Sequence, residues 1–583
     1  MKIKILLVAV NAKYIHSNPA VYSLRTYAGE ELQKHIELAE YTINQYMQDV
    51  LADIYRRKPD VIGFSCYIWN WSMIRELLCE IPKLLPVTDI RLGGPEVSYD
   101  GEAVLREFPH VRGIMVGEGE ETFRELVGWY VDGQTTAVDN IAGLYLPGGY
   151  SNVREPLDLS RVPFLYNELD TFANRVIYYE SSRGCPYRCS YCLSSIDKKV
   201  RLRDIEIVKE ELQFFLDHQV KQVKFVDRTF NCDHNHAMAI WQYIKEHDNG
   251  VTNFHFEISA DILREDEIEL LNSLRPGLAQ LEIGVQSVNE DTLCAINRRM
   301  DVERLEEIVA KLRRGDNIHL HLDLIAGLPY EDYDSFVTSF NRVYKMKPEQ
   351  LQLGFLKVLK GSPMAEKAEE YGIVYLDKPP YEVLYTNWLS YEEVVRLKQI
   401  EEMVEMYYNS NQFIHTMPVL ERAFDGPFAL YEALADYFEE EGFFLESPSR
   451  AYRYQVLLNF AVKYDGEHTE LYRELLLYDM YLRENLKSRP EFATDLWERE
   501  ECKVFSRDFY KKEEQERFYL PAYSAYDSRQ LSKMTHLEPF RYSVWDTSSE
   551  MTEGLYYVLF DYKERSPLTK EARTMIFLPE GNR

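Results

Sequence analysis

The chain has 583 residues, of which 45% are hydrophobic and 13% aromatic, and its net charge is −29 at pH 7. A chain of this length and apolar content can bury several cores, which predicts about two to four domains. The excess of 96 Asp and Glu over 67 Lys and Arg, without a long basic run, disfavours binding to nucleic acid. No run of residues has the length and hydrophobicity of a membrane span, so no membrane insertion is expected.

Residues 1–147 are expected to form a doubly wound α/β domain of the Rossmann type. Short apolar runs, which predict buried strands, alternate with polar segments that predict helices. The strands are expected at residues 3–10, 61–65, 89–92 and 111–116, and the helices at residues 18–38 and 71–84. Such alternation is typical of a parallel sheet with helices on both faces. The first apolar run is too short for a cleaved signal peptide.

Three of these strands lead into short loops of small residues, at residues 63–66, 93–96 and 117–122. Ligands bind at the carboxyl ends of the strands in such sheets, so the three loops together predict a groove for a cofactor. Each loop taken alone is better explained as a tight turn between a strand and a helix.

A linker rich in Gly, Pro and charge is expected at residues 148–172, followed by a partial parallel (β/α)6 barrel at residues 173–365. The strand-like runs of this second region begin near residues 176, 223, 254, 280, 319 and 351. Loops at the carboxyl ends of barrel strands build the active site, so polar residues at these ends are the candidates for function.

The most informative motif is CxxxCxxC, formed by Cys185, Cys189 and Cys192. Three thiolates on one tight loop can hold three irons of a four-iron cluster and leave the fourth iron open to a chelating ligand. A structural zinc site needs four protein ligands, and no second cysteine pair with suitable spacing is near. Cluster-binding thiolates need a reducing compartment, which predicts a cytoplasmic protein.

This spacing, with Tyr191 directly before the last cysteine, resembles the radical SAM superfamily. The upstream loops Gly93-Gly94-Pro95 and Gly117-Glu118-Gly119 resemble the N-terminal domain of its cobalamin-dependent (B12-binding) branch. The resemblance covers roughly residues 1–365. It implies a 4Fe-4S cluster on the three cysteines and S-adenosylmethionine (SAM) at the open iron. It also implies cobalamin, held by residues of the first domain: Asn11, Tyr14, Ser65, Gly93, Gly94, Pro95, Gly117, Glu118 and Gly119.

SAM offers an ammonium, a carboxylate, two hydroxyls and an adenine, so its site needs anions and donors from several strands. The resemblance implies that these groups come from Tyr191, Asp227, Arg228, Ser259, Glu282, Gln286 and Arg298. Asp227 and Arg228 correspond to the place where the family binds the methionyl amine. Each residue taken alone could instead be a helix cap or a satisfied buried polar group, and Arg298 could lie on a solvated helix face.

The first domain lacks the Asp-x-His-x-x-Gly loop whose histidine binds cobalt from below in many cobalamin domains. His16 and His35 do not have the flanking Asp and Gly. The resemblance therefore implies cobalamin without a histidine lower ligand. A Rossmann-like domain that has lost its cofactor is the alternative.

Other candidate residues give weaker signals. The alternating spacing of Cys232, His234 and His236 could suit a metal, but a strand or turn would splay these side chains, and a surface loop is the favoured reading. Cys66 and Cys294 are expected to be small core residues, because free cysteines are usually buried.

Residues 366–583 are expected to form a mostly helical domain. Residues 391–407, for example, have apolar positions three to four residues apart. The many tyrosines are expected to fill a core and an interface rather than to line a cap. The sequence indicates no role for this domain.

The resemblance implies that the reduced cluster cleaves SAM to a 5'-deoxyadenosyl radical, which takes hydrogen from an unactivated carbon. With methyl-carrying cobalamin, the expected reaction is carbon methylation. A radical SAM cyclase or rearrangement enzyme, and a non-catalytic corrinoid or iron-sulfur binding protein, remain alternatives. The electron donor is expected to be a flavodoxin or ferredoxin, and the substrate is not indicated.

Overall fold

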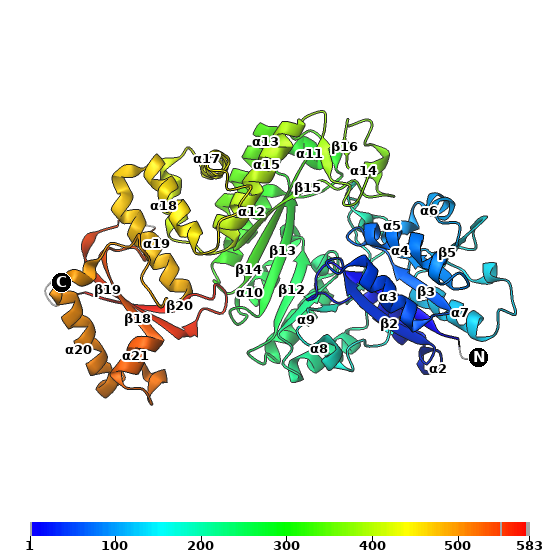
Figure 1. The fold of residues 1–583 in the computed structure, drawn as a ribbon, viewed down its shortest axis with the longest axis horizontal. Helices are drawn as coiled ribbons and strands as arrows, with labels where there is room; N and C mark the ends of the chain where they lie inside the picture. The colour runs from blue at the N-terminus through cyan, green and yellow to red at the C-terminus, as the bar shows by residue number, and fades with distance from the viewer. Residues whose placement is uncertain (1–2, 548–550, 579–583) are drawn as a thin grey trace. The chain divides into compact units, whose positions relative to one another are not determined.

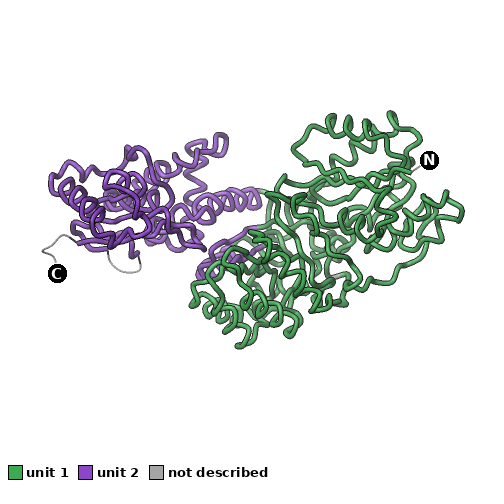
Figure 2. The backbone as a smooth tube through the Cα atoms, turned by 90° about the horizontal axis from the view of Figure 1, so that it is seen from below, with its two compact units in different colours: residues 1–318, 325–333, 354–391 green, residues 319–324, 334–353, 392–583 purple. Residues whose placement is uncertain are grey.

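The computed structural model describes residues 3–547 and 551–578. The chain divides into two compact units, coloured separately in Figure 2. The first consists of residues 1–318, 325–333 and 354–391, and the second of residues 319–324, 334–353 and 392–583.

The first sheet has seven strands in the order β2-β1-β3-β4-β5-β6-β7, of which the first five are parallel (Figure 1). The strands are β1 (Ile5–Asn11), β2 (Ile36–Thr42), β3 (Val61–Ser65), β4 (Asp89–Gly93), β5 (Val111–Met115), β6 (Leu144–Leu146) and β7 (Gly149–Tyr150). The helices are α1 (Pro19–Tyr27), α2 (Glu30–Gln33), α3 (Met47–Arg57), α4 (Trp71–Leu84), α5 (Pro95–Ser98), α6 (Gly101–Glu107) and α7 (Glu120–Val131). The strand order changes direction at β1, so a ligand crevice is expected where β1 and β3 end.

The two faces of β1 pack against different helices, as its alternating side chains require. Leu6 and Val8 share one apolar cluster with residues of α3 and α4, while Leu7 and Ala9 share another with residues of α1 and α7. All seven residues of β1 are buried. The continuous apolar run in the sequence therefore reflects a strand covered on both faces.

Strand β2 lies in a segment that the sequence predicted to be helical. Residues 18–38 fold instead as α1, α2 and the start of β2. The sequence from Glu37 to Glu40 has high helix propensity, but parallel pairing along the whole of β2 with β1 overrides it. Local propensity is a weak guide where a strand partner is available.

The linker to the second sheet is held in place by hydrogen bonds. Arg203 donates to the carbonyl oxygens of Leu159 and Val162, the latter at 2.8 Å. The backbone N–H of Leu157 donates to Glu118 Oε2 at 2.6 Å. The linker is therefore attached to both of the sheets that it connects.

The second sheet has six strands in the order β15-β14-β13-β12-β11-β8, and the pairings among β8, β11, β12 and β13 are parallel. The strands are β8 (Ile177–Tyr179), β11 (Gln222–Phe225), β12 (Asn253–Ile258), β13 (Ala279–Gln286), β14 (His319–Ala326) and β15 (Gln350–Phe355). The helices are α8 (Ile205–Asp217), α9 (His234–Glu246), α10 (Glu265–Asn272), α11 (Glu290–Ala295), α12 (Val302–Arg313), α13 (Tyr333–Lys345) and α14 (Pro363–Glu366). Two short antiparallel pairs complete the region: β9 (Ser182–Arg183) with β10 (Arg201–Leu202), and β16 (Val374–Tyr375) with β17 (Val383–Tyr385).

Alternate residues of β13 lie on opposite faces of the sheet. Leu281 and Ile283 are buried, whereas Glu282, Gly284 and Gln286 are partly exposed. Glu282, Gly284 and Gln286 therefore share one face of the strand. One face of β13 is thus apolar, and the other presents polar groups.

The C-terminal region is mainly helical, as predicted, but it ends in a three-stranded antiparallel sheet that was not expected. The helices are α15 (Tyr391–Val404), α16 (Thr416–Leu420), α17 (Pro427–Glu440), α18 (Tyr452–Tyr464), α19 (Thr469–Arg483), α20 (Glu500–Glu516) and α21 (Ser528–Met534). The strands are β18 (Thr535–Tyr542), β19 (Glu553–Arg565) and β20 (Ala572–Phe577). The run of apolar residues in β19 is continuous, and such a run does not distinguish a buried strand from a buried helix.

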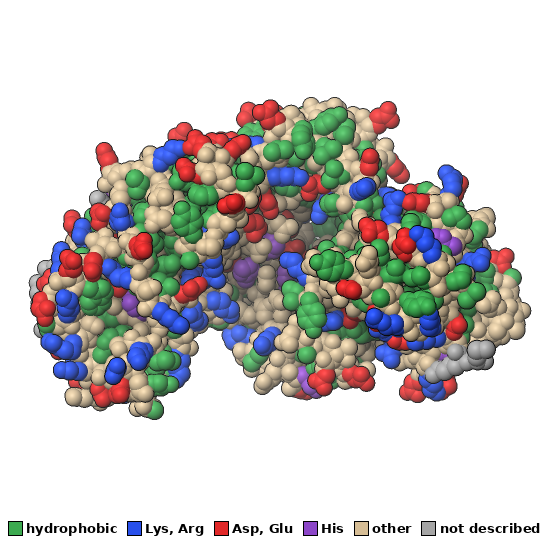
Figure 3. Space-filling model, viewed as in Figure 1, with side chains coloured by type: hydrophobic (Ala, Val, Ile, Leu, Met, Phe, Trp, Pro, Cys, Tyr) green, Lys and Arg blue, Asp and Glu red, His purple; other side chains and the backbone are tan. Residues whose placement is uncertain are grey.

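The surface carries charges of both signs. On the face shown in Figure 3, Asp and Glu side chains are intermixed with Lys and Arg. Neighbouring charges along a helix form ion pairs such as Lys34 with Glu31, at 2.7 Å. Exposed pairs of this kind contribute little to stability. Among the described residues, no helix has the length and hydrophobicity needed to cross a membrane.

Replacement of Gly94 by alanine is expected to destabilise the protein more than replacement of Gly133. Both glycines have positive φ (112° and 75°), where alanine costs about 1 kcal/mol. A Cβ on Gly94 would also lie 2.4 Å from the carbonyl oxygen of Cys66, whereas a Cβ on Gly133 meets no described atom within 4 Å. The midpoint of thermal unfolding, followed by circular dichroism, should therefore fall further for G94A. Equal shifts would contradict the close approach of the loops after β3 and β4.

Candidate functional site

The three motif cysteines lie on one tight loop at the carboxyl end of β8, between β9 and β10. Cys185 and Cys189 are buried, and Cys192 is partly exposed. The backbone N–H of Cys192 donates to the carbonyl of Cys189 at 3.2 Å, and that of Cys185 to the carbonyl of Asp197 at 3.0 Å. Backbone hydrogen bonds therefore fix the loop at both ends of the motif.

Arg298 lies beside this loop and not on a solvated helix face. Its Nη1 donates to Cys189 Sγ at 3.8 Å, and its Nη2 donates to the carbonyl of Gly284 on β13. Burial raises the pKa of the Cys189 thiol, and the nearby guanidinium opposes that rise. A fixed cation favours the thiolate form that binds metal, so the donor set fits an iron-sulfur cluster.

Asp227, which the family resemblance assigned to the amine of SAM, follows the end of β11. Its side chain is completely buried. The carboxylate accepts hydrogen bonds from Ser181 N at 3.0 Å, Ser181 Oγ at 2.7 Å and Ser182 Oγ at 2.6 Å. These hydrogen bonds attach the residues just before the cysteine loop to the Asp227 carboxylate.

A histidine that sequence reasoning did not connect with the site also lies beside Ser181. His236 Nε2, from α9, lies 3.1 Å from Ser181 Oγ. Burial raises the pKa of Asp227 to about 6, although the hydrogen bonds from Ser182 and Ser181 lower it. Burial also lowers the pKa of His236. Asp227, Ser181, Ser182 and His236 therefore form one hydrogen-bond network at the start of the cysteine loop.

The interior face of the sheet carries a polar cluster around Glu282 of β13. Its Oε2 lies 3.1 Å from Lys224 Nζ and 2.8 Å from His255 Nε2. These partners come from β11 and β12, at directly paired positions. Sequence reasoning missed both residues, although each lies on the same strand face as the predicted candidates.

The other predicted SAM contacts surround the cysteine loop. Ser259 accepts a hydrogen bond from Tyr187 of the loop at 3.2 Å and donates to Asp261 at 2.7 Å. Gln286 ends β13 with φ of 73°, and its buried Oε1 has no hydrogen-bond partner among the described residues. A buried acceptor without a partner fits a site that receives a ligand.

Two further candidates differ in environment. Arg228, directly after the buried Asp227, is exposed, whereas Tyr191 is partly buried against the apolar cluster that contains Ile296 and Met364. Burial raises the pKa of the Tyr191 hydroxyl, which therefore stays protonated.

A cavity of about 630 Å³ lies within the first unit. This volume is in the range of ordinary cofactor sites. Its walls come from the start of α1, from the loops after β3, β4 and β5, and from residues 178–183 beside the cysteine loop. The predicted cobalamin residues that line it are Ser65, Gly93, Gly94, Pro95, Gly117, Glu118 and Gly119.

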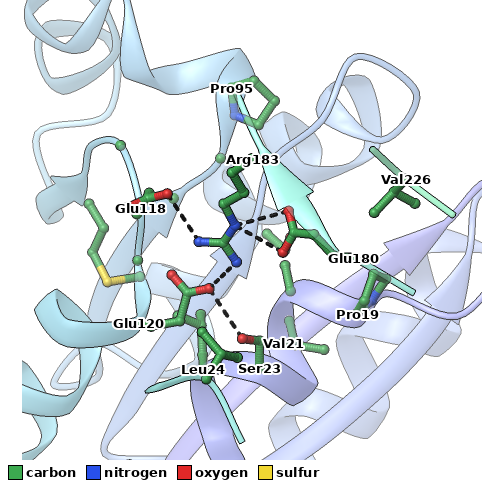
Figure 4. Close-up of a pocket in the computed structure, with 18 of the residues that line it drawn as sticks. Pro19, Val21, Ser23, Leu24, Pro95, Glu118, Glu120, Glu180, Arg183 and Val226 are labelled. Carbon is green, nitrogen blue, oxygen red and sulfur yellow. Dashed lines mark hydrogen bonds and ion pairs between the residues drawn. The ribbon is translucent and has the colours of Figure 1, made fainter. Parts of the chain in front are cut away.

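Figure 4 shows Arg183 at the centre of this cavity wall. It forms ion pairs with Glu120 at 2.6 Å, Glu118 at 3.2 Å and Glu180 at 2.9 Å. Although burial opposes it, the hydrogen bond from Arg201 holds the pKa of Glu118 below its ordinary value, with help from Arg183. Arg183 stands two residues before the first motif cysteine, and sequence reasoning did not identify its partners.

The two predicted cobalamin residues of the first loop do not line the cavity. Asn11 is buried and donates to Glu40 Oε1 at 3.0 Å, so its amide stabilises the loop after β1. Tyr14 is exposed, with the Arg175 guanidinium 5.4 Å from its ring.

The two histidines of this domain have protein partners. His16 Nδ1 lies 2.5 Å from the hydroxyl of Tyr178, and His35 Nδ1 lies 2.9 Å from the carbonyl of Ile3. Neither belongs to the described lining of the cavity. The absence of a histidine lower ligand to cobalt stays a prediction.

The spacing of Cys232, His234 and His236 does not produce a common metal site. His234 lies 3.2 Å from Asp266 and 3.3 Å from Glu267, whereas His236 faces Ser181. The start of α9 directs these side chains to different neighbours.

The two isolated cysteines behave differently. Cys66 is fully buried, as predicted, and burial raises the pKa of its thiol well above the ordinary value. The prediction for Cys294 is wrong, because α11 presents this residue to solvent.

Three family models match the chain. A B12 binding domain matches residues 5–127, the radical SAM superfamily matches residues 179–343, and a protein family of unknown function, DUF4080, matches residues 369–560. The radical SAM match implies a 4Fe-4S cluster and SAM, and the B12 match implies cobalamin. The cysteine loop and the cavity fall within or between these matched regions.

Two curated relatives are methyltransferases. The cobalamin-dependent radical SAM methyltransferase TokK of Streptomyces tokunonensis is 25% identical over 354 residues, which cover 56% of this chain and 51% of that protein. The 2-(S-pantetheinyl)-carbapenam-3-carboxylate methyltransferase of Streptantibioticus cattleyicolor is 25% identical over 476 residues, which cover 71% of this chain and 65% of that protein. The chain thus matches less than two thirds of the length of either relative.

The fold is also found in a solved structure. The radical SAM methyltransferase TsrM of Kitasatospora setae, with cobalamin and a 4Fe-4S cluster bound, superposes with a TM-score of 0.53 at 17% identity. The match covers 65% of this chain and 79% of that one, and at this identity it shows the fold alone. The three family models show that the chain contains a B12-binding domain, a radical SAM domain and a C-terminal domain of the DUF4080 type, in this order.

Proposed function

We propose that the protein is a cobalamin-dependent radical SAM enzyme that methylates an unactivated carbon. The observation that carries this proposal is the position of the cavity, whose wall runs from the strand ends of the B12-type sheet to Arg183 beside the cysteine loop. Methylation is favoured because both curated relatives described above are named methyltransferases.

We assign Cys185, Cys189 and Cys192 as ligands of the cluster. We assign Arg298 to partial compensation of the negative charge of the thiolates. When bound, the cofactors would supply hydrogen abstraction by a SAM-derived radical and a transferable methyl group. The chain's own contribution is to hold the cofactors in register and to exclude water. The hydrogen bonds that Asp227 accepts from Ser181 and Ser182 support the loop that carries the cysteines.

For SAM we keep the contacts on the interior face and around the loop. The candidates are Tyr191, Arg228, Ser259, Glu282, Gln286 and Arg298. Glu282 is held by Lys224 and His255, so its orientation is fixed before a ligand arrives. Asp227 is reassigned from a contact with the methionyl amine to a positioning role, because its carboxylate oxygens are already used.

For cobalamin we assign the loops after β3, β4 and β5 that line the cavity. Glycines in these loops let the backbone approach a large ligand closely. The electron donor is proposed to be a flavodoxin or ferredoxin, and the thiolate cluster requires a reducing compartment such as the cytoplasm. The domain boundaries at residues 147, 172 and 365 remain predictions, and the C-terminal domain receives no assigned role.

Turnover by the anaerobic, reconstituted protein is expected to release 5'-deoxyadenosine and S-adenosylhomocysteine together, because one SAM makes the radical and another supplies methyl. Both products can be quantified by chromatography with mass detection, with candidate substrates, cobalamin and a reductant. Substrate-dependent 5'-deoxyadenosine without methyl transfer would indicate a cyclase or rearrangement enzyme. Absence of both products with an intact cluster would indicate a binding protein.

Cys185→Ala, Cys189→Ala and Cys192→Ala are each expected to abolish the four-iron cluster, because the three thiolates are the complete ligand set that the CxxxCxxC loop supplies. Iron and sulfide analysis after anaerobic reconstitution measures this loss. Cys232→Ala is the matched control, because Cys232 is electrostatically coupled to Cys185 but lies outside the motif. A full iron complement in any motif variant would exclude the assignment.

Asp227→Asn is expected to lower the cluster content, whereas Glu282→Gln is expected to lower the affinity for SAM. Asp227→Asn removes a charge that holds Ser181 and Ser182, so the protein should retain less cluster. Glu282→Gln should keep the cluster and weaken SAM binding by roughly tenfold or more, as expected for loss of a hydrogen bond to a charged group. Iron content and equilibrium dialysis with SAM distinguish the two. Normal iron content with weakened SAM binding in Asp227→Asn would restore the original assignment.

A further inference from the structure

Arg183 connects two loops that are far apart in the sequence. Its Nε makes two hydrogen bonds of 2.9 Å with the carboxylate of Glu180, which fixes the guanidinium relative to its own strand region. Its Nη2 donates to Glu120, the first residue of α7, at 2.6 Å, and its Nη1 donates to Glu118, in the loop after β5, at 3.2 Å (Figure 4). The planar fork of arginine is suited to such divided contacts, and a lysine ammonium is not.

The partners of Arg183 are themselves held in place. Glu118 also accepts hydrogen bonds from Arg201 Nη1 at 3.1 Å and from the Leu157 amide at 2.6 Å. Glu120 Oε1 accepts from Ser23 Oγ of α1 at 3.2 Å. Glu118 and Glu120 are therefore linked by hydrogen bonds to the linker, to α1 and to Arg201 as well as to Arg183.

The burial of this network makes its contacts strong. The side chain of Arg183 is 18% exposed and that of Glu120 is 7% exposed. Breaking a buried ion pair by removal of one partner is costly, because it leaves an uncompensated charge. Loss of Arg183 would leave three carboxylates facing one another, so the cavity loop and the cysteine loop are expected to shift together.

We propose that Arg183 is a positioning residue that couples the two cofactor sites energetically. The inference rests on the proposed function, because it assigns cobalamin to the cavity and the cluster to the cysteine loop. Only Gly184 separates Arg183 from Cys185, so ordering of the cysteine loop by a cluster also orders Arg183. Arg183 then orders Glu118 and Glu120, which flank Gly119 in the cavity wall.

Ordering of one loop by the first cofactor reduces the ordering that the second cofactor requires, which makes the coupling positive. By thermodynamic linkage the effect is reciprocal. Cobalamin should therefore bind more tightly to protein that carries the cluster, and the cluster should resist chelators better when cobalamin is bound.

The test is equilibrium dialysis of cyanocobalamin against the full chain, with and without its reconstituted cluster. The wild-type protein should bind cyanocobalamin at least about fivefold more tightly when the cluster is present, the lower end of usual coupling factors. In Arg183→Lys this ratio should fall close to one, while the cluster is still taken up. Glu118→Gln and Glu120→Gln should lower it in part, without changing the cysteine loop itself.

Arg57→Lys is the matched control, because Arg57 also bridges two carboxylates, those of Glu37 and Asp53, away from the cavity. It should keep the wild-type ratio. A protein that binds no cyanocobalamin in either state would overturn the proposed function and this inference with it. Equal binding in both wild-type states, or a wild-type ratio in Arg183→Lys and both glutamine variants, would overturn the coupling and leave the proposed function standing.

Discussion

Parallel strand pairing is the constraint on which this site depends. All strands of a parallel sheet end at one edge, so the loops after β3, β4 and β5 gather on one side of the first sheet. The loops after β8, β11, β12 and β13 gather in the same way on the second. Both sets belong to one compact unit, and the cavity draws its walls from both. The backbone topology thus brings together groups that lie far apart in the sequence.

Features that depend on local patterns could be predicted from the sequence. Cys185, Cys189 and Cys192 remain neighbours in any fold, because a segment of eight residues contains all three. Strand β3 and helix α4 lie at the predicted residues, since their hydrophobic periods are clear and their ends are marked by polar residues. The loops of small residues that follow the strands were likewise found from the sequence alone.

Features that depend on distant partners could not be predicted. The partners of Asp227, Ser181 and Ser182, lie 46 and 45 positions away, so the sequence pattern around Asp227 does not show them. Arg298 contacts a cysteine 109 positions away, and two of the three carboxylates around Arg183, those of Glu118 and Glu120, come from the segment after β5. Strand β2 was missed for a related reason, because its helix-forming residues obtain a strand partner only after the first sheet assembles.

The hydrogen bonds of the linker restrict how the walls of the cavity can move. Leu157, Leu159 and Val162 tie it to Glu118 and Arg203, so the two sheets of the first unit cannot separate by simple rotation about a free hinge. A change in the spacing of the cavity walls must therefore break some of these hydrogen bonds. Local openings of this kind occur on the order of microseconds to seconds, so the cavity walls can rearrange only on that timescale.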